Sequence, residues 1–111
     1  MARFIKGDVV IVPFPFSDLT QTKRRPALVV AILPGEDLIL CQITSQSVID
    51  EYAVPICEED FITGGLRQPS NIRPNRLFTA SENIIVYQSG QTSPEKLDNA
   101  IGNIVEILQK L

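Results

Sequence analysis

The chain has 111 residues, 44% of them hydrophobic, which suits one compact domain over residues 1–111 and leaves no room for a separate substrate domain. It contains no histidine, which excludes imidazole acid–base chemistry and, with only two cysteines, the common zinc sites. The formal net charge of −3 excludes nucleic-acid binding through overall basicity, so such binding would need a local cationic patch.

The first half of the chain predicts short strands separated by turns. Residues 9–12 form a β-branched run that prolines interrupt, and a long polar loop follows from about Phe14 to Arg25. The apolar runs 26–33 and 38–43 flank the turn Pro34-Gly35-Glu36-Asp37. They predict a central hairpin.

The second half predicts further short strands and one helix. The strands are expected at 52–57, 70–73 and 84–88, with turns at 63–65 and 80–83. This pattern favours a mainly β fold with a C-terminal helix (α+β), arranged as a small barrel or a curled antiparallel sheet.

The helix begins at a clear signal, with Ser93 as N-cap, Pro94 at the first position and Glu95 in the first turn. An apolar stripe at three- and four-residue steps is predicted to pack on the sheet, and consists of Leu97, Ile101, Ile104, Leu108 and Leu111. Gly102 lowers helix propensity, so we expect close packing there.

The N-terminal residues and the cysteines bear on location and redox state. Residues 1–4 lead into a charged segment without an apolar signal region, and no apolar run approaches the roughly 20 residues that cross a bilayer. We therefore expect a cytoplasmic protein without a membrane segment. Cys41 and Cys57 lie in apolar contexts, which predicts buried free thiols. A disulfide bond between them is the alternative that the sequence leaves undecided.

Polar residues lie at the ends of two neighbouring predicted strands. Lys23-Arg24-Arg25-Pro26 opens one strand and Ile43-Thr44-Ser45-Gln46 closes the next. If these strands pair as a hairpin, Arg25 and Thr44 lie at the same end of the sheet and reach one phosphate, through a bidentate guanidinium and a hydroxyl donor. Taken singly, Arg25 is better explained as a strand-edge charge and Thr44 as an ordinary β-branched residue. Their coincidence at one predicted strand edge, beside a polar loop, favours a site.

Other residues extend this candidate site toward RNA. Lys23 and Arg24 add cationic charge, and Ser45 and Gln46 offer hydrogen bonds to base or sugar. Phe14 and Phe16 are either stacking platforms for a base or, more often for such residues, core or dimer-interface residues. Arg73 and Arg76 either extend an RNA groove or pair with the acids of residues 50–60.

The same residues carry a resemblance to a known family. The segments involved are Gly7-Asp8-Val9-Val10, Phe14-Pro15-Phe16-Ser17-Asp18, Arg25-Pro26-Ala27-Leu28-Val29-Val30, Thr44-Ser45-Gln46, Ser70-Asn71-Ile72-Arg73-Pro74 and Leu77-Phe78-Thr79. In this order they resemble the PemK/MazF-like toxins of bacterial type II toxin-antitoxin systems, over nearly the whole chain.

The resemblance implies an SH3-like antiparallel β-barrel, a homodimer and a cognate antitoxin as partner. It also implies a metal-independent endoribonuclease without cofactor that cuts single-stranded RNA at short sequences, leaving 2′,3′-cyclic phosphate and 5′-hydroxyl ends. The essential arginine and threonine of the family fall on Arg25 and Thr44.

One departure concerns the general base. Several family members carry a glutamate five residues before the arginine, where this chain has Thr20. Asp18 is then a secondary catalytic candidate, or alternatively a loop-capping residue. Two other functions stay open: a relative of the same fold that binds DNA gyrase, and a binding module that contacts only an antitoxin.

Overall fold

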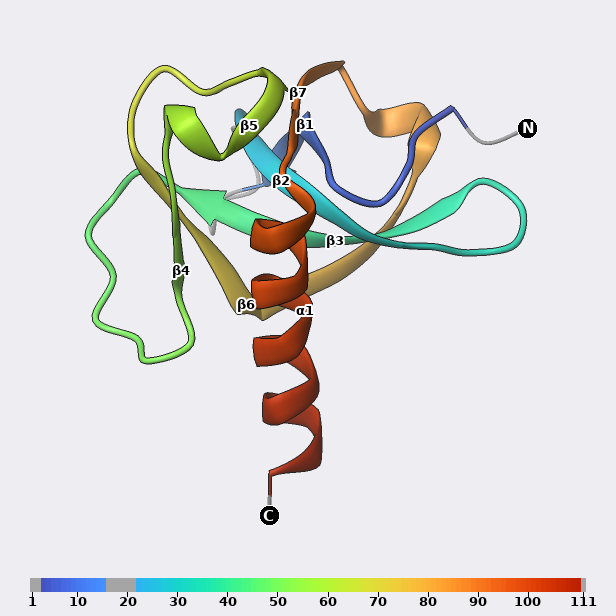
Figure 1. Cartoon of the computed structure of the whole chain (residues 1–111). Coiled ribbons are helices and arrows are strands. Elements are labelled where there is room, and N and C mark those ends of the chain that lie inside the picture. Colours follow the sequence, from blue (N-terminus) through green and yellow to red (C-terminus); the bar gives the residue numbers. More distant parts are fainter. Residues whose placement is uncertain (1–2, 16–21, 111) are drawn as a thin grey trace.

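One curved antiparallel sheet and a C-terminal helix make up the computed structural model, which describes residues 3–15 and 22–110 (Figure 1). The seven strands of the described part follow the order β4-β6-β3-β2-β1-β7-β5 in the sheet. Their bounds are β1 Asp8–Pro15, β2 Thr22–Ile32, β3 Asp37–Thr44, β4 Val54–Ile56, β5 Phe61–Gly64, β6 Ser70–Ser81 and β7 Tyr87–Thr92. The mainly β architecture with a C-terminal helix, α1 (Pro94–Gln109), is confirmed.

The predicted hairpin is confirmed, because β2 pairs with β3 through Leu28 and Cys41 among others. The predicted loop from Phe14 to Arg25 is wrong at both ends, since Phe14 pairs with Lys23 within the β1–β2 ladder. The prolines do not stop β1 because its pairing with β7 ends at Ile11. Beyond that point one side of β1 is an edge, where a missing N–H costs no ladder bond.

Strand β6 is much longer than the predicted segment 70–73. Its pairing with β3 shifts between Ile43↔Ile72 and Cys41↔Leu77, so that residues 73–76 stand opposite Gln42 alone. We call these four residues the β6 bulge. Pro74 within the bulge is fully buried, and its missing N–H is compatible with a bulged position but not with a regular central ladder.

Two further elements differ from the predictions. The sequence indicates only a turn at the position of strand β5. The strand was not predicted because its exposed residues show no apolar alternation. The predicted strand 84–88 is displaced, since Ile84 belongs to a short 3-10 turn and β7 begins at Tyr87.

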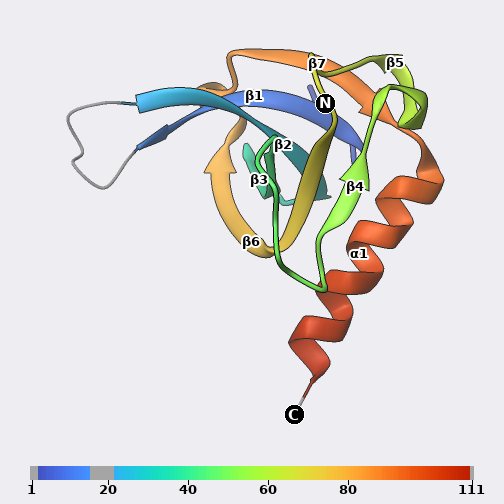
Figure 2. The same ribbon diagram turned by 90° about the vertical axis from the view of Figure 1, so that its left-hand side faces the viewer.

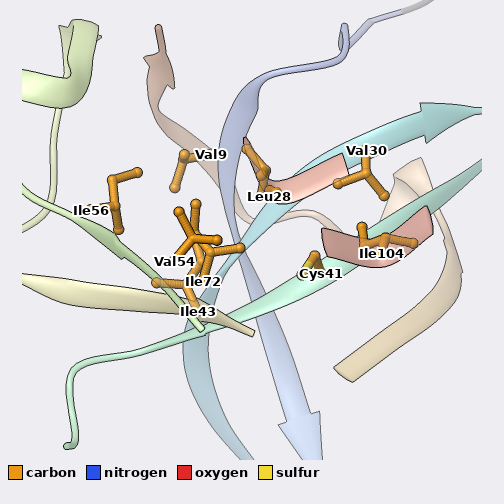
Figure 3. Packing of buried hydrophobic residues seen from close by; sticks show 10 residues of the cluster. Val9, Leu28, Val30, Cys41, Ile43, Val54, Ile56, Ile72 and Ile104 are labelled. Atoms are coloured by element: carbon orange, nitrogen blue, oxygen red, sulfur yellow. The ribbon is translucent and has the colours of Figure 1, made fainter. Parts of the chain in front are cut away.

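Both faces of the sheet are covered, which explains the continuous apolar run in β2. Leu28 and Val30 belong to the core cluster under α1, and Figure 3 shows them with β-strand and helix residues converging on one space. Ala27 and Val29 point to a second cluster on the opposite face. Strand alternation thus fills two cores from one segment.

Helix α1 begins as predicted, because the Ser93 hydroxyl accepts a hydrogen bond from the Lys96 amide at 3.3 Å. Ala100 and Ile104 are buried, but Leu108 is 73% exposed. Figure 2 shows the reason: the C-terminal part of α1 extends beyond the sheet. The inward stripe therefore ends early, and Leu111 lies outside the described residues. Close packing at Gly102 is wrong, since a Cβ there would meet nothing within 4 Å.

The two cysteines are free, as predicted, but only Cys41 is buried. Burial raises the pKa of the Cys41 thiol to about 12. Cys57 is half-buried, and the hydrogen bond from its Sγ to Glu59, 3.0 Å long, raises the pKa of that thiol to about 11. Both thiols stay protonated near neutral pH, so neither is a ready nucleophile.

No helix in the described part of the chain combines the length and the apolar character that a membrane crossing requires.

Candidate nucleic-acid interface

A cleft of about 640 Å³ opens where β2, β3 and the β6 bulge meet. We call it the Thr44 cleft. Its lining includes most of the residues that the sequence singled out: Phe14, Arg25, Thr44, Gln46, Arg73 and Arg76. They come from segments far apart in the chain, and the sheet brings them together.

The strand register explains how Arg25 and Thr44 reach the same cleft. Ala27 of β2 pairs with Gln42 of β3, and the same antiparallel register continued by two residues brings Arg25 opposite Thr44. Residues two apart share a face of the sheet. Arg25, Gln42 and Thr44 therefore point to one side, and all three line the cleft.

Thr44 is only 7% exposed, yet its hydroxyl lies at the cleft wall. The Oγ1 atom accepts a hydrogen bond from the Gln46 amide at 3.2 Å, which satisfies one lone pair and leaves the O–H free to donate. Arg25 is half-buried beside it. The pair thus offers a positive fork and a neutral donor to the same space.

The β6 bulge supplies the two other cations of the cleft, Arg73 and Arg76. Asp50 holds the bulge from the loop after β3: its carboxylate accepts from the Asn75 side chain at 2.8 Å and lies 3.4 Å from Arg73. The predicted ion pair between Arg73 and the acids of residues 50–60 is confirmed, and Arg73 lines the cleft as well; its contact with RNA stays a prediction. Its buried Nε has no hydrogen-bond partner.

The backbone amide of Tyr52 fixes the orientation of the Asp50 carboxylate, to which it donates at 2.8 Å. This hydrogen bond is the main cause of a lowered Asp50 pKa, and Asn75 and Arg73 act in the same direction. Asp50 therefore stays ionised at neutral pH and keeps the bulge in place.

Aromatic rings form the apolar wall of the Thr44 cleft. Phe14 of β1 and Phe78 of β6 pack edge to face, with centroids 5.0 Å apart and an interplanar angle of 69°. Phe14 is thus partly a packing residue, although it also lines the cleft. Phe16 lies outside the described residues.

A second cleft, of about 480 Å³, lies on the opposite side of the same strand ends. We call it the Tyr87 cleft. Arg24 and Ser45 line it, because each stands one residue away from Arg25 or Thr44 and so points to the other face. Strand alternation therefore divides the predicted RNA-binding set between two clefts.

Neither cleft has a described aspartate or glutamate in its lining, and each has three arginines. Arg25 is common to both. Although the chain carries a formal net charge of −3, this end of the sheet is locally positive. Such a distribution favours an anionic ligand, as the sequence predicts for a patch rather than for the whole surface.

A family model described as the PemK-like, MazF-like toxin of type II toxin-antitoxin systems matches residues 5–108. The chain belongs to this family.

Solved structures share the fold of this PemK/MazF-like toxin. An endoribonuclease in complex with its cognate antitoxin, from Mycobacterial species, superposes with a TM-score of 0.75 at 13% identity, covering 97% of each chain. A MazE-MazF complex from Deinococcus radiodurans gives 0.71 at 18% identity, with 96% of each chain covered. Toxin MazF-mt6 from Mycobacterium tuberculosis gives 0.67 at 17% identity, covering 89% of this chain and 95% of that one. A comparison with curated proteins gave no match.

The remaining predicted site residues of this PemK/MazF-like toxin fall elsewhere. Lys23 is exposed on β2 and lines neither cleft. Asp18 and Thr20 lie outside the described residues.

Several cleft residues were missed as site candidates by sequence reasoning, among them Gln42, Arg67 and Tyr87. A signal existed for Gln42, since it is the one polar residue of the run 38–43 and stands two residues before Thr44. Period-two alternation alone would have placed it on the Thr44 face. Arg67 and Tyr87 had no such signal, because their place depends on β5 and β7, whose bounds the sequence did not indicate.

Proposed function

We propose that this chain is the toxin of a type II toxin-antitoxin system, a single PemK/MazF-like domain that cuts single-stranded RNA without a metal or cofactor. The observation that carries the proposal is that Arg25 and Thr44 line one cleft, whose described lining holds two further arginines and no carboxylate. Membership of the toxin family supports it.

The chemistry follows from the groups in the cleft. In the proposed reaction the RNA 2′-hydroxyl attacks the adjacent phosphorus, its proton passes to water, the bond from phosphorus to the 5′-oxygen breaks, and that oxygen takes a proton. The products are a 2′,3′-cyclic phosphate and a 5′-hydroxyl. Charge accumulates on the non-bridging oxygens of the phosphorane, where the Arg25 fork and the Thr44 hydroxyl act as donors.

The role of Arg25 is electrostatic. A guanidinium keeps its proton at any ordinary pH, so Arg25 is a poor choice for general base. The described lining of the cleft contains no carboxylate that would take this role, which is why we assign the proton to water. Asp18 stays a secondary candidate.

The other cations bind the RNA chain rather than the reacting phosphate. We assign phosphate contacts to Arg73, Arg76, Lys23 and Arg24, and contacts to base or sugar to Ser45 and Gln46. Arg73 and Arg76 reach the substrate from the bulge that Asp50 holds.

The proposed biological setting is the cytoplasm, with the toxin as a homodimer that a cognate antitoxin neutralises. Support comes from solved relatives described as an endoribonuclease in complex with its cognate antitoxin and as MazE-MazF. A disordered antitoxin segment that folds on binding would compete with RNA for the positive cleft.

The test is incubation of the purified chain with mixed-sequence RNA, with and without chelator, followed by mapping of the ends. We expect chelator-resistant cuts with 5′-hydroxyl ends, reduced at least about 100-fold in Arg25→Ala and strongly in Arg25→Lys, which keeps the charge but loses the fork. Lys6→Ala, an exposed charge outside both clefts, is the matched control. Growth arrest without RNA cleavage, or full activity in Arg25→Ala, would overturn the proposal.

A further inference from the structure

We propose that the Tyr87 cleft is a second nucleotide subsite, which binds the phosphate and base of a residue next to the cleaved bond. This inference rests on the proposed endoribonuclease function. It assigns substrate-binding roles to Arg67 and Tyr87, two residues that the sequence did not single out.

The first support for the inference is the position of the Tyr87 cleft relative to Arg25. Arg25 is the only described residue that lines both clefts. A phosphate held by Arg25 and Thr44 therefore lies where the two clefts meet. Because an RNA chain continues on both sides of any internal phosphate, one cleft receives the nucleotides on one side and the other cleft receives those on the other side.

The charge of the Tyr87 cleft matches a phosphate. Arg24 and Arg67 line it and are exposed. The ion pairs with described acids include those of Arg73, Lys96 and Lys110, and neither Arg24 nor Arg67 is neutralised by a described acid. Their planar forks suit the non-bridging oxygens of a phosphodiester.

The rest of the lining matches a base and a sugar. Tyr87 of β7 is 55% exposed and presents a ring on which an unpaired base stacks. The Ser70 hydroxyl donates to the Gln68 carbonyl at 3.0 Å and the Ser89 hydroxyl donates to the Gly65 carbonyl, so both are held with an acceptor lone pair remaining. Acceptors of this kind suit base amino groups or a 2′-hydroxyl.

The size of the cleft favours a nucleotide over a folded partner. Its volume of about 480 Å³ lies within the range of roughly 300–1,000 Å³ that is typical of small-molecule sites. The lining combines charged and polar groups with apolar residues that include Ile11 and Ile43. A folded protein partner buries about 800 Å² on each side, which extends well beyond a single cleft of this kind.

The experiment uses the full chain and an RNA whose cleavage site has been mapped. Its probe carries a 2′-deoxy nucleotide where the attacking hydroxyl would stand, so that binding is measured without cleavage. Fluorescence anisotropy compares the full-length probe with probes shortened on either side of the uncut bond. The variants are Arg67→Ala, Tyr87→Ala and Tyr87→Phe, with Lys6→Ala as the control.

For the full-length probe we expect affinity about 10-fold lower in Arg67→Ala and in Tyr87→Ala, and near wild type in Tyr87→Phe, which keeps the stacking ring. Shortening the probe on one particular side should abolish these differences, because that side no longer reaches the cleft.

The possible failures are distinguishable. Suppose that the wild type cleaves RNA, and that Arg67→Ala and Tyr87→Ala bind the full-length probe with wild-type affinity. The proposed subsite is then wrong, and the endoribonuclease function stands. If instead those variants lose affinity for a peptide of the antitoxin and not for RNA, the cleft is a protein contact and the inference is overturned. A wild type that neither cleaves nor binds RNA overturns both proposals.

Discussion

Thr44 is a buried residue whose hydroxyl is held in place by a hydrogen bond. It is 7% exposed, and its oxygen already accepts the Gln46 amide at 3.2 Å. The O–H of this hydroxyl and its second lone pair stay available to a ligand, and its rotamer is restrained by the hydrogen bond that it accepts. Preorganised donors of this kind are effective because they need no rearrangement when charge develops.

We therefore predict that Thr44→Val lowers the cleavage rate by about 100-fold, whereas Thr44→Ser keeps most of it. Valine preserves the β-branched shape and removes only the hydroxyl. Loss of the hydrogen bond from Gln46 costs about 1 kcal/mol of unfolding free energy, which urea unfolding measures separately. Equal rates in the two variants would show that the hydroxyl is not used.

Asp50 gives a pH prediction. Its folded pKa lies below the ordinary value of 3.8, chiefly because the Tyr52 amide donates to it. The folded state thus favours the ionised form, and the resulting stability is present above pH 3.8 and is lost as the pH falls through the folded pKa. Urea unfolding should show wild type and Asp50→Asn differing most above about pH 5, and converging toward pH 2.5.

The control for this measurement is Glu58→Gln, which removes one exposed carboxyl from the same acidic segment. A stability difference between wild type and Asp50→Asn that stays constant from pH 6 to 2.5 would contradict the assigned role of the carboxylate charge.

Single residues were predicted best where alternation along one hairpin decides their place. The position of Arg25 and Thr44 follows from the pairing of two adjacent strands alone, and the apolar runs and the turn at 34–37 indicate that pairing. The division between clefts was not predicted, although it follows from the same alternation, because the runs of β2 and β3 were not assigned to faces. Tyr87 depended on a strand order that short-range patterns do not contain.

At the scale of elements, the contact between β5 and β7 shows how closely two strands approach. Gly64 pairs with Gly90, and a Cβ at Gly90 would lie 2.5 Å from the Thr63 carbonyl oxygen. Only glycine fits this position without moving the backbone. The strand pair that frames the Tyr87 cleft thus depends on the absence of a side chain.

Two glycine substitutions should therefore have opposite effects. Gly90→Ala is expected to lower the unfolding free energy by about 2 kcal/mol through backbone displacement. Gly102→Ala, in helix α1 where nothing lies within 4 Å of the added carbon, should raise it by roughly 0.5–1 kcal/mol through helix propensity. Urea unfolding of both variants checks the pair, and a destabilised Gly102→Ala would contradict the open surroundings.

Element types were predictable where local chemistry is decisive. The cap at Ser93 and Pro94 identifies the start of α1, and two apolar runs identify the hairpin. The β6 strand was not predictable beyond Arg73, because Pro74 and the polar residues around it resemble a turn. Its continuation depends on a tertiary partner, β3, which accepts a bulge of four residues.

At the scale of the whole molecule, charge is distributed unevenly. The net charge is −3, yet the described lining of both clefts is free of carboxylates. Acidic residues gather instead around 50–60 and on the exposed side of α1. RNA would approach a surface that repels it except at one end of the sheet, which restricts non-specific binding.

The salt dependence of RNA binding should report the number of phosphate contacts. For single-stranded RNA, the logarithm of the binding constant falls with the logarithm of salt by about 0.7 per phosphate contact. Arg76→Ala removes an exposed cation from the Thr44 cleft and should reduce the slope by about 0.7. Lys6→Ala should leave the slope unchanged. Titration of the uncleavable RNA at several salt concentrations measures both, and equal slopes for Arg76→Ala and wild type would contradict a phosphate contact.

The β6 bulge has a consequence for how such a toxin diversifies. Its residues lie outside the ladder, while Ile72 and Leu77 on either side keep their partners in β3. Arg76 is exposed and lines the Thr44 cleft, so exchanging it changes what the cleft presents to a ligand without shifting any strand, whereas Asn75 donates to Asp50 and helps to hold the bulge. What the cleft presents to a ligand thus depends on Arg76, while the place of the bulge depends on its neighbours Arg73 and Asn75, which contact Asp50.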